Sequence, residues 1–328
     1  MAKQKLLLVD GSSLAFRAFF SILDLNRFKN SNGLHTNALY SFHRMFKSIL
    51  DSEKPTHVLV AWDAGKTTFR TEMYADYKGG RSKTPGEFIE QMPYFNVLLD
   101  AWGIPHYRLN QYEADDIIGT LARKGEEAGY EVVVLSGDKD LIQLADNNIT
   151  VKITTKGVTE LVEYTPEVIF EKYGLTPEHI IDMKGLMGDS SDNYPGVTKV
   201  GEKTAVKLLQ EFGSVEGIYE HVDEMKKSKL KENLINDKEL AFLSKKLARI
   251  NVESPIEITL EDTLRKEQDV DALMSFYKEM NFNSFQSDLL NSGGATVEEA
   301  PKAERPTVKS VAQISDNMLK SATSVHFE

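Results

Sequence analysis

Acidic residues gather in five short blocks of this 328-residue sequence, and their types and spacing limit the chemistry that the chain could perform. The blocks read LLLVDGSS, VLVAWDAG, QYEADDIIG, VVVLSGDKDL and GDSSDN. They contain Asp10, Asp63, Glu113, Asp115, Asp116, Asp138, Asp140, Asp189 and Asp192. Carboxylates crowd together only where cations compensate them, because each unpaired charge taken out of water costs several kcal/mol. Oxygen ligands without histidine or cysteine select Mg²⁺, with Mn²⁺ as a substitute, so we predict two or more such ions in a site for phosphoryl transfer.

Three of these aspartates come at or just after the end of an apolar run that is typical of a buried parallel strand. The runs are 5–10, 57–62 and 131–136, and helical patterns alternate with them at 36–51, 87–101 and 112–128. Ligands of open α/β sheets bind beyond the carboxyl ends of the strands, so we expect Asp10, Asp63 and Asp138 at one edge. A single such aspartate could simply cap a helix. Five blocks together favour an active site on an α/β domain.

The periodicity along the chain predicts two domains and a tail. An α/β domain with a largely parallel sheet covers 1–175 and includes a strand hairpin, 149–154 and 158–164, that turns at Lys156-Gly157. Helical patterns follow at 165–173, 177–187, 202–211, 214–221, 229–234 and 237–248. We expect a helical subdomain over 176–290. Residues 291–310 have the composition of a linker, and 311–328 are expected to begin a further domain.

Composition and charge narrow the classes of function. The chain has no cysteine, which excludes thiolate nucleophiles and disulfides, and no apolar run approaches the roughly 20 residues of a membrane span. We expect a cytoplasmic monomer. The net charge of −11 argues against nucleic acid, but residues 64–83 carry five cations, Lys66, Arg70, Lys78, Arg81 and Lys83, against two carboxylates. That segment could be a lid that holds phosphates or a solvated surface loop.

Spacing within the acidic blocks separates stronger ligand candidates from weaker ones. Glu113 and Asp116 are three apart and share a face of the helix that EADD opens. Asp115 lies off that face, so a metal contact from it requires a distorted first turn or a bridging water. Asp138 and Asp140 can both point into one site, whereas Asp189 and Asp192 could merely cap a helix.

The stretch PGVTKVGEKTAVKLL, residues 195–209, has the form of a helix-hairpin-helix. A tight turn from Gly196 to Gly201 leads into a helix that carries Lys203 and Lys207. Glycines at such a turn let backbone N–H groups approach DNA phosphates, as helix N-termini do. The alternative is a simple connection between two helices.

The acidic blocks, the segment YADYKGGR and the hairpin motif occur in an order that resembles the 5′-nuclease domains of bacterial DNA polymerase I, relatives of flap endonucleases. The resemblance covers about residues 4–285 and implies a PIN-like (resolvase-like) α/β domain with a helix-hairpin-helix. It implies removal of 5′ flaps or RNA primers from branched or nicked duplex DNA, with a polymerase domain following in the same chain.

The resemblance also implies roles for individual residues. One metal group would be Asp10, Asp63, Glu113, Asp115 and Asp116, and a second Asp138, Asp140, Asp189 and Asp192. Lys78 and Arg81 would contact the scissile phosphate, with Tyr77 and Arg17 nearby. Further DNA-binding candidates are Arg70, Gly196, Val197, Gly201, Lys203 and Thr204, and a monovalent cation, K⁺, would lie near Val197 and Val200.

Three other functions compete with two-metal phosphodiester hydrolysis. A PIN-like ribonuclease would use a similar site, but the hairpin motif and the chain length disfavour it. A phosphatase of the haloacid dehalogenase type needs a second aspartate two residues after Asp10, where Ser12 stands. A non-catalytic DNA-binding module would not need the complete acidic set.

Overall fold

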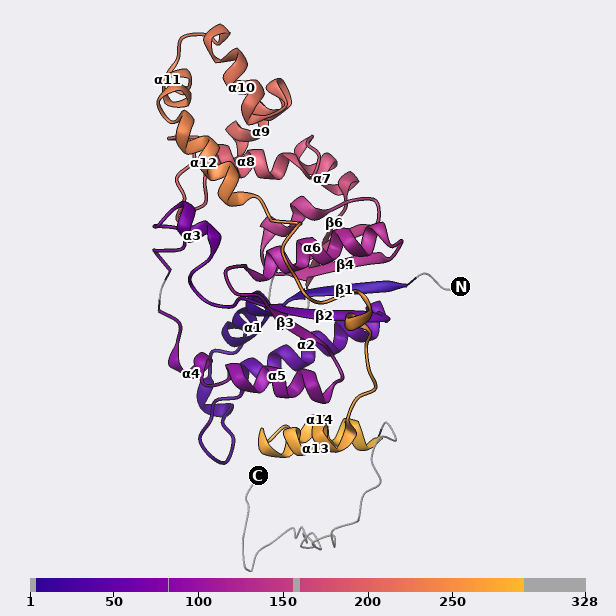
Figure 1. Cartoon of the computed structure of the whole chain (residues 1–328). Coiled ribbons are helices and arrows are strands. Elements are labelled where there is room, and N and C mark those ends of the chain that lie inside the picture. Colours follow the sequence, from indigo (N-terminus) through magenta and orange to yellow (C-terminus); the bar gives the residue numbers. More distant parts are fainter. Residues whose placement is uncertain (1–3, 82, 156–159, 292–328) are drawn as a thin grey trace, which may run out of the picture.

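A six-stranded sheet organises the molecule, seen in a computed structural model that describes residues 4–81, 83–155 and 160–291 (Figure 1). The strands lie in the order β3-β2-β1-β4-β5-β6. Their bounds are β1 Lys5–Asp10, β2 His57–Trp62, β3 His106–Arg108, β4 Glu131–Ser136, β5 Ile149–Thr154 and β6 Leu161–Tyr164. β6 alone runs antiparallel, pairing with β5. In register, Val9 lies opposite Val60 of β2 and Leu135 of β4, so the carboxyl ends of these three strands are level.

Helices cover both faces of the sheet, which explains why its central strands are apolar throughout. Leu7 and Val9 point into one core, formed with α1 Gly11–Phe20, α2 Asn37–Glu53 and α5 Met92–Ala101. Leu6 and Leu8 point to the opposite face, where α6 Ala114–Glu127 packs. The alternation follows from the two-residue period of a strand.

A helical region follows the sheet and lies at one end of it in Figure 1. Its helices are α7 Pro166–Tyr173, α8 His179–Met187, α9 Glu202–Phe212, α10 Val215–His221, α11 Lys229–Asn236 and α12 Lys238–Ala248. α8 packs against both α9 and α12. The residues of this region continue the core that begins under α6, so the two parts share one apolar interior.

After α12 the chain returns along the α/β domain through residues 249–269, which we call the return segment. The backbone N–H of Ile250 donates to Gln143 Oε1 at 2.9 Å, and that of Ser254 donates to Thr120 Oγ1 at 3.0 Å. Two further helices, α13 Val270–Glu279 and α14 Asn283–Asn291, then pack on the far core with α2 and α5. His43 of α2 anchors them, because its Nε2 lies 2.7 Å from Tyr277 Oη and its ring stacks on Phe285.

The structure has the predicted strands 5–10, 57–62, 131–136 and 149–154, and the predicted helices agree within a few residues. The predicted helix 87–101 is divided into α4 Gly86–Ile89 and α5. The short strand β3 and the helices α1, α3 Phe69–Met73, α13 and α14 were not predicted. Residues 270–290 were expected in the helical subdomain, but they pack on the α/β core. The predicted turn at Lys156-Gly157 and the tail from 292 lie outside the described residues. Among the helices that are described, each is too short or too polar to cross a membrane.

Candidate active site

The carboxyl ends of β1, β2 and β4 bring three of the predicted aspartates to one edge of the sheet. Asp10 is only 4% exposed, and its Oδ1 accepts the Ser13 N–H at 2.9 Å while its Oδ2 accepts Ser136 Oγ–H at 2.6 Å. Asp63 Oδ1 accepts the backbone N–H of Ala114 at 2.9 Å, which ties the end of β2 to the start of α6. Asp138 follows β4 and caps a 3-10 helix, Lys139–Leu144.

The first turn of α6 directs Asp115 toward this edge. Burial, together with the charges of Asp10 and Asp138, raises the pKa of Asp115 well above its usual range. Asp115 does lie off the face that Glu113 and Asp116 share, as predicted. The turn is not distorted, because Glu113 caps the helix in a regular capping box with Asp116. The off-face position is therefore the one that meets the acidic edge.

A second acidic group forms around Lys184 of α8. The Lys184 ammonium pairs with Asp140 and with Asp189, and the Asp189 carboxylate also accepts the N–H and hydroxyl of Ser191. Burial and the charge of Asp138 raise the pKa of Asp140 to about 7. Although burial acts in the opposite direction, the hydrogen bonds from Lys184 and Ser191 hold the pKa of Asp189 at about 2. The GDSSDN turn therefore faces Asp140 and does not serve only as a helix cap.

The basic segment 64–83 is packed onto the site by Tyr77, Lys78 and Arg81. Lys78 Nζ donates to Glu113 Oε1 at 2.6 Å, and Arg81 Nη2 donates to Asp192 Oδ1 at 2.5 Å. Tyr77 Oη lies 3.2 Å from Glu113 Oε2 and 3.1 Å from Asp192 Oδ2, between the two carboxylates. The described part of this segment is thus joined to both acidic groups, unlike a solvated surface loop.

Two predicted site residues lie in the interior instead. Arg70 is 2% exposed and Asp116 0% exposed, and Arg70 Nη1 and Nη2 each donate to Asp116 at 2.8 Å. We do not retain Arg70 as a DNA-binding residue, because its guanidinium has no exposed face for a phosphate. Asp116, predicted as a metal ligand, is paired with Arg70 inside the protein.

The two hairpin glycines differ in their surroundings. Gly196 is buried with a φ of +62°, and an added Cβ would lie 2.2 Å from the Gly188 nitrogen. Its own N–H donates to Ser244 Oγ at 3.1 Å, so it is not available to a phosphate. Gly201 faces open space and begins α9, beside the exposed Lys203 and the half-buried Thr204. Of the two glycines, only Gly201 lies on a surface that a DNA backbone could reach.

The remaining candidates lie near these groups. Arg17 of α1 approaches Gly137, the residue before Asp138, and its Nη1 donates to the Thr155 carbonyl at 2.7 Å. Val197 and Val200 have buried side chains, and the Val200 N–H donates to the Val197 carbonyl at 3.1 Å. Val197 and Val200 can therefore offer only backbone carbonyl oxygens to a cation.

The chemistry of the donor set fits divalent cations. Burial and the charge of Asp63 raise the pKa of Asp10 to about 7, and the pKa values of Asp115 and Asp140 are raised for the same kind of reason. Such carboxylates are short of positive charge, and hard oxygen ligands suit Mg²⁺. No three acidic or histidine side chains of the described residues already form a closed cage. Side-chain rearrangement would accompany ion binding.

The crowding predicts that Asp115→Asn will stabilise the metal-free protein. A carboxyl group whose pKa is raised by folding makes the folded protein less stable as the pH rises above the pKa of that group in the unfolded chain. The reason is that the folded state binds more protons than the unfolded state in this pH range. The mutant should therefore have a higher Tm than wild type in EDTA at pH 8. The difference should shrink as the pH is lowered, because wild-type Asp115 then takes up a proton and loses its charge. Thermal unfolding of both proteins across this range measures it, and an equal or lower mutant Tm at pH 8 would contradict the crowding.

Lys184, Ser136 and Tyr194 belong to the site but were not predicted. Burial, with the nearby charges of Asp140 and Asp189, raises the pKa of Tyr194, and its buried Oη has no hydrogen-bond partner among the described residues. Lys184 lies five positions before Asp189 in the predicted helix 177–187, which is the only signal that could have indicated it. Ser136 Oγ accepts the Asp138 N–H and donates to Asp10, but one serine at the end of a strand carries no sequence signal.

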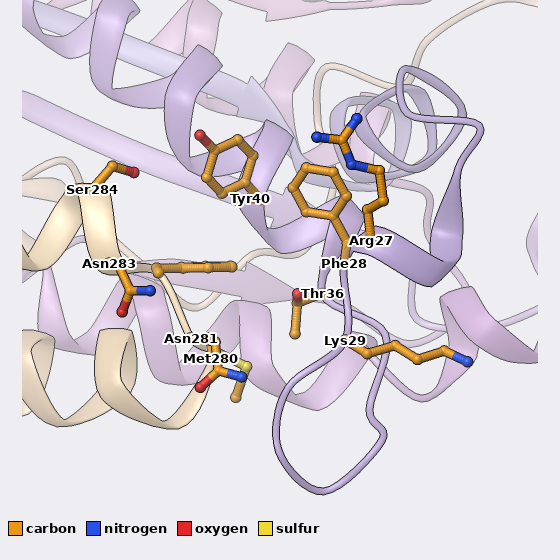
Figure 2. Close-up of a pocket in the computed structure, with 10 residues that line it drawn as sticks. Arg27, Phe28, Lys29, Thr36, Tyr40, Met280, Asn281, Asn283 and Ser284 are labelled. Carbon is orange, nitrogen blue, oxygen red and sulfur yellow. The ribbon is translucent and has the colours of Figure 1, made fainter. Parts of the chain in front are cut away.

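A separate hollow of about 250 Å³ lies between residues 27–40 and the turn that joins α13 to α14 (Figure 2). Phe28 and Tyr40 line it with ring centroids 5.2 Å apart, Asn281 comes from the turn, and Asn283 is the first residue of α14. None of the predicted site residues is among its described lining. The acidic edge therefore remains the candidate active site.

A parallel sheet with carboxylates and cations at its carboxyl edge, joined to a helical region with a glycine hairpin, defines a resolvase-like nuclease. Residues 5–174 match the family model of the 5′-3′ exonuclease N-terminal resolvase-like domain. Residues 175–271 match that of the 5′-3′ exonuclease C-terminal SAM fold. The chain belongs to the 5′-3′ exonuclease family.

Relatives and solved structures agree with this assignment. DNA polymerase I of Lactococcus lactis subsp. cremoris is 59% identical over 94% of this chain and 36% of its own length. DNA polymerase I of Streptococcus pneumoniae is 57% identical over 100% of this chain and 37% of its own length. The chain thus spans about a third of these relatives.

Among solved structures, T5 5′-exonuclease with bound zinc ions is 25% identical, with a TM-score of 0.62 over 88% of this chain and 99% of that one. The catalytic core of Rad2 in complex with a DNA substrate is 18% identical, with a TM-score of 0.60 over 88% of this chain and 91% of that one. The second likeness concerns the fold alone.

Proposed function

We propose that this nuclease hydrolyses phosphodiester bonds of 5′ flaps and RNA primers in branched or nicked duplex DNA. The observation that carries the proposal is the convergence of Asp10, Asp63, Asp115 and Asp138 on one edge, with Lys78 and Arg81 beside it. An acidic edge alone fits any metal-dependent phosphoryl transfer. The adjoining cations add a place for the phosphate itself.

The proposed ligands form two groups around the edge. Asp10, Asp63, Glu113 and Asp115 would hold one divalent ion, and Asp138, Asp140, Asp189 and Asp192 the other. Bound Mg²⁺, or Mn²⁺ in its place, would supply an activated water and stabilise the charge that develops on the phosphate. No nucleophilic side chain and no covalent intermediate are needed.

Lys78 and Arg81 have the geometry to position the scissile phosphate. Each of these cations is paired with a carboxylate. Burial acts to lower the pKa of Lys78, but the charges of Glu113 and Asp192 raise it. Lys78 is therefore cationic across the physiological range. Divalent ions held at Glu113 and Asp192 would neutralise these carboxylates, which would leave both cations free to face the phosphate. Tyr77 would keep its hydroxyl between the two carboxylates, and Arg17 lies beside Asp138.

Duplex DNA would be held through its backbone. α9 begins at the open residue Gly201, and its first N–H groups, with Lys203 and Thr204, suit a phosphate. We propose that the backbone carbonyls near Val197 and Val200 would hold a K⁺ ion, which would add positive charge to the hairpin surface. Contacts to the backbone carry no base information, so cleavage would depend on the structure of the substrate and not on its sequence.

The relatives suggest the biological setting. They are full-length DNA polymerases I, so we propose a cytoplasmic, monomeric nuclease that works with a polymerase domain of the same chain in replication and repair. Because these relatives are DNA polymerases, a DNA partner is favoured over single-stranded RNA.

Cleavage of matched substrates tests the proposal. A 5′-labelled flap, a hairpin and a single-stranded RNA would be incubated with the chain in Mg²⁺ and in EDTA. We expect Mg²⁺-dependent cutting at the base of the flap. Preferential cutting of single-stranded RNA would favour the ribonuclease alternative, and cutting of the flap in EDTA would contradict metal dependence.

The hairpin predicts different results for its two glycines. Gly201→Val should leave the fold intact, because its Cβ has open space, and should weaken duplex affinity. The slope of log affinity against log salt should fall by about 0.9 for each phosphate that the variant no longer neutralises. Gly86→Val, at another open glycine that begins α4, is the control. Gly196→Val should instead misfold, and unchanged affinity of folded Gly201→Val would make the hairpin a simple helix connection.

A further inference from the structure

The carboxylate of Asp116 is fully engaged inside the protein. Its Oδ1 accepts Arg70 Nη2–H at 2.8 Å and the Asn251 N–H at 2.9 Å. Its Oδ2 accepts Arg70 Nη1–H at 2.8 Å and the Glu113 N–H at 3.1 Å. A carboxylate has about four lone-pair positions, so these four hydrogen bonds occupy all of them. Asp116 differs in this from Asp115, which faces the other carboxylates.

Arg70 is engaged to the same extent. Besides Asp116, its Nη1 donates to Glu113 Oε2 at 3.2 Å, its Nε to the Leu247 carbonyl at 2.9 Å and its Nη2 to the Arg249 carbonyl at 2.8 Å. A guanidinium has five N–H donors, and all five are used. The ion pair is therefore complete within the protein and needs neither a metal ion nor DNA.

The pair joins three parts of the molecule whose relative positions matter for the proposed reaction. Arg70 belongs to α3, seven residues before Tyr77 and eight before Lys78 in the basic segment. Asp116 and Glu113 start α6 at the acidic edge. The carbonyls of Leu247 and Arg249 end α12, the last helix of the helical region.

We propose that Arg70 and Asp116 are positioning residues, which hold Glu113 and the basic segment in place for the phosphodiester hydrolysis proposed above, and that Asp116 is not a metal ligand. Glu113 is held through both its N–H and its side chain, and Lys78 meets the opposite oxygen of the same carboxylate at 2.6 Å. Loss of the pair would free Glu113 and Lys78 together. A displacement of about 1 Å at a reacting group can slow a reaction about 10²-fold.

Two other roles for Asp116 make different predictions for the metal-free protein. A metal ligand that faces other carboxylates is relieved by neutralisation, so its Asn variant gains stability in EDTA, as expected for Asp115→Asn. The partner of a buried arginine is needed for stability, so Asp116→Asn loses stability in EDTA. A purely structural pair would lower Tm without changing the rate of cleavage by folded molecules.

The test measures Tm in EDTA, flap affinity in EDTA, and the single-turnover rate at saturating flap and Mg²⁺, well below Tm. The variants of the full chain are Asp116→Asn, Arg70→Lys, Arg70→Gln with Asp116→Asn, and Asp115→Asn for comparison. We expect Asp116→Asn to have a lower Tm, a rate lowered about 10²-fold and nearly unchanged affinity. Arg70→Lys keeps the positive charge beside Asp116, so it should cleave faster than Asp116→Asn. The double variant should be little slower than Asp116→Asn.

Each outcome decides the proposal. A raised Tm of Asp116→Asn in EDTA would make Asp116 a member of the metal group and overturn it. A lowered Tm with a wild-type rate would reduce the pair to a structural role and also overturn it. If wild type itself failed to cut the flap, the proposed function would fail, while the sign of the Tm change would still show whether Asp116 pairs with Arg70.

Discussion

Replacing Asp138 or Asp63 with asparagine is expected to slow flap cleavage about 10² to 10⁴-fold, which would nearly abolish it. Each variant removes one negative charge from the proposed metal ligands. The Asp138 carboxylate accepts the N–H of Asp140, and the Asp63 carboxylate accepts the N–H of Ala114. An asparagine at either position still has a side-chain oxygen that can accept the same hydrogen bond. The fold should therefore survive, and relief of crowding could raise the stability of the metal-free protein.

The measurement is the single-turnover rate at saturating flap over a range of Mg²⁺ concentrations, with circular dichroism to confirm folding. Asp223→Asn is a matched control, because Asp223 is an exposed aspartate of the helical region. It should cleave at the wild-type rate. Wild-type turnover of either site variant at saturating Mg²⁺ would refute the assignment of its carboxylate to a metal.

Replacing Lys78 or Arg81 with alanine is expected to lower the single-turnover rate about 10² to 10³-fold while changing flap affinity little. These cations would act on one reacting phosphate, whereas affinity comes from many contacts along the duplex. Their present partners, Glu113 and Asp192, would be left without those cations, so the variants should also bind the divalent ion at least as readily as wild type.

Affinity and rate must be measured separately to interpret these variants. Lys83→Ala is the matched control, because Lys83 is an exposed cation of the same basic segment. A Lys78→Ala protein that bound the flap much more weakly yet cleaved at the normal saturated rate would move Lys78 from phosphate positioning to DNA binding. The same reasoning applies to Arg81.

The sequence determined the features that depend on a few neighbouring residues. Each buried strand is a short apolar run, and the aspartate that ends it lies at the carboxyl edge whatever the rest of the chain does. The positions of Asp10, Asp63 and Asp138, and the family motifs, could therefore be predicted. Helix α1 was missed although its buried residues have helical spacing, because the exposed Phe16 and Phe20 obscure that spacing in the sequence.

The tertiary structure decided which of several similar residues face the site. Asp115 and Asp116 are adjacent in the sequence, yet one meets Asp10 and the other meets Arg70, 46 positions away. From the sequence, Arg70 is one of several cations in a polar segment. In the structure its Nε donates to the Leu247 carbonyl, 177 positions away. Gly196 and Gly201 differ because backbone atoms of residues 186–188 pack against the first, which also has a positive φ. Each of these choices depends on partners that only packing brings together, since hydrogen bonds and burial act over a few ångströms of space and not along the chain.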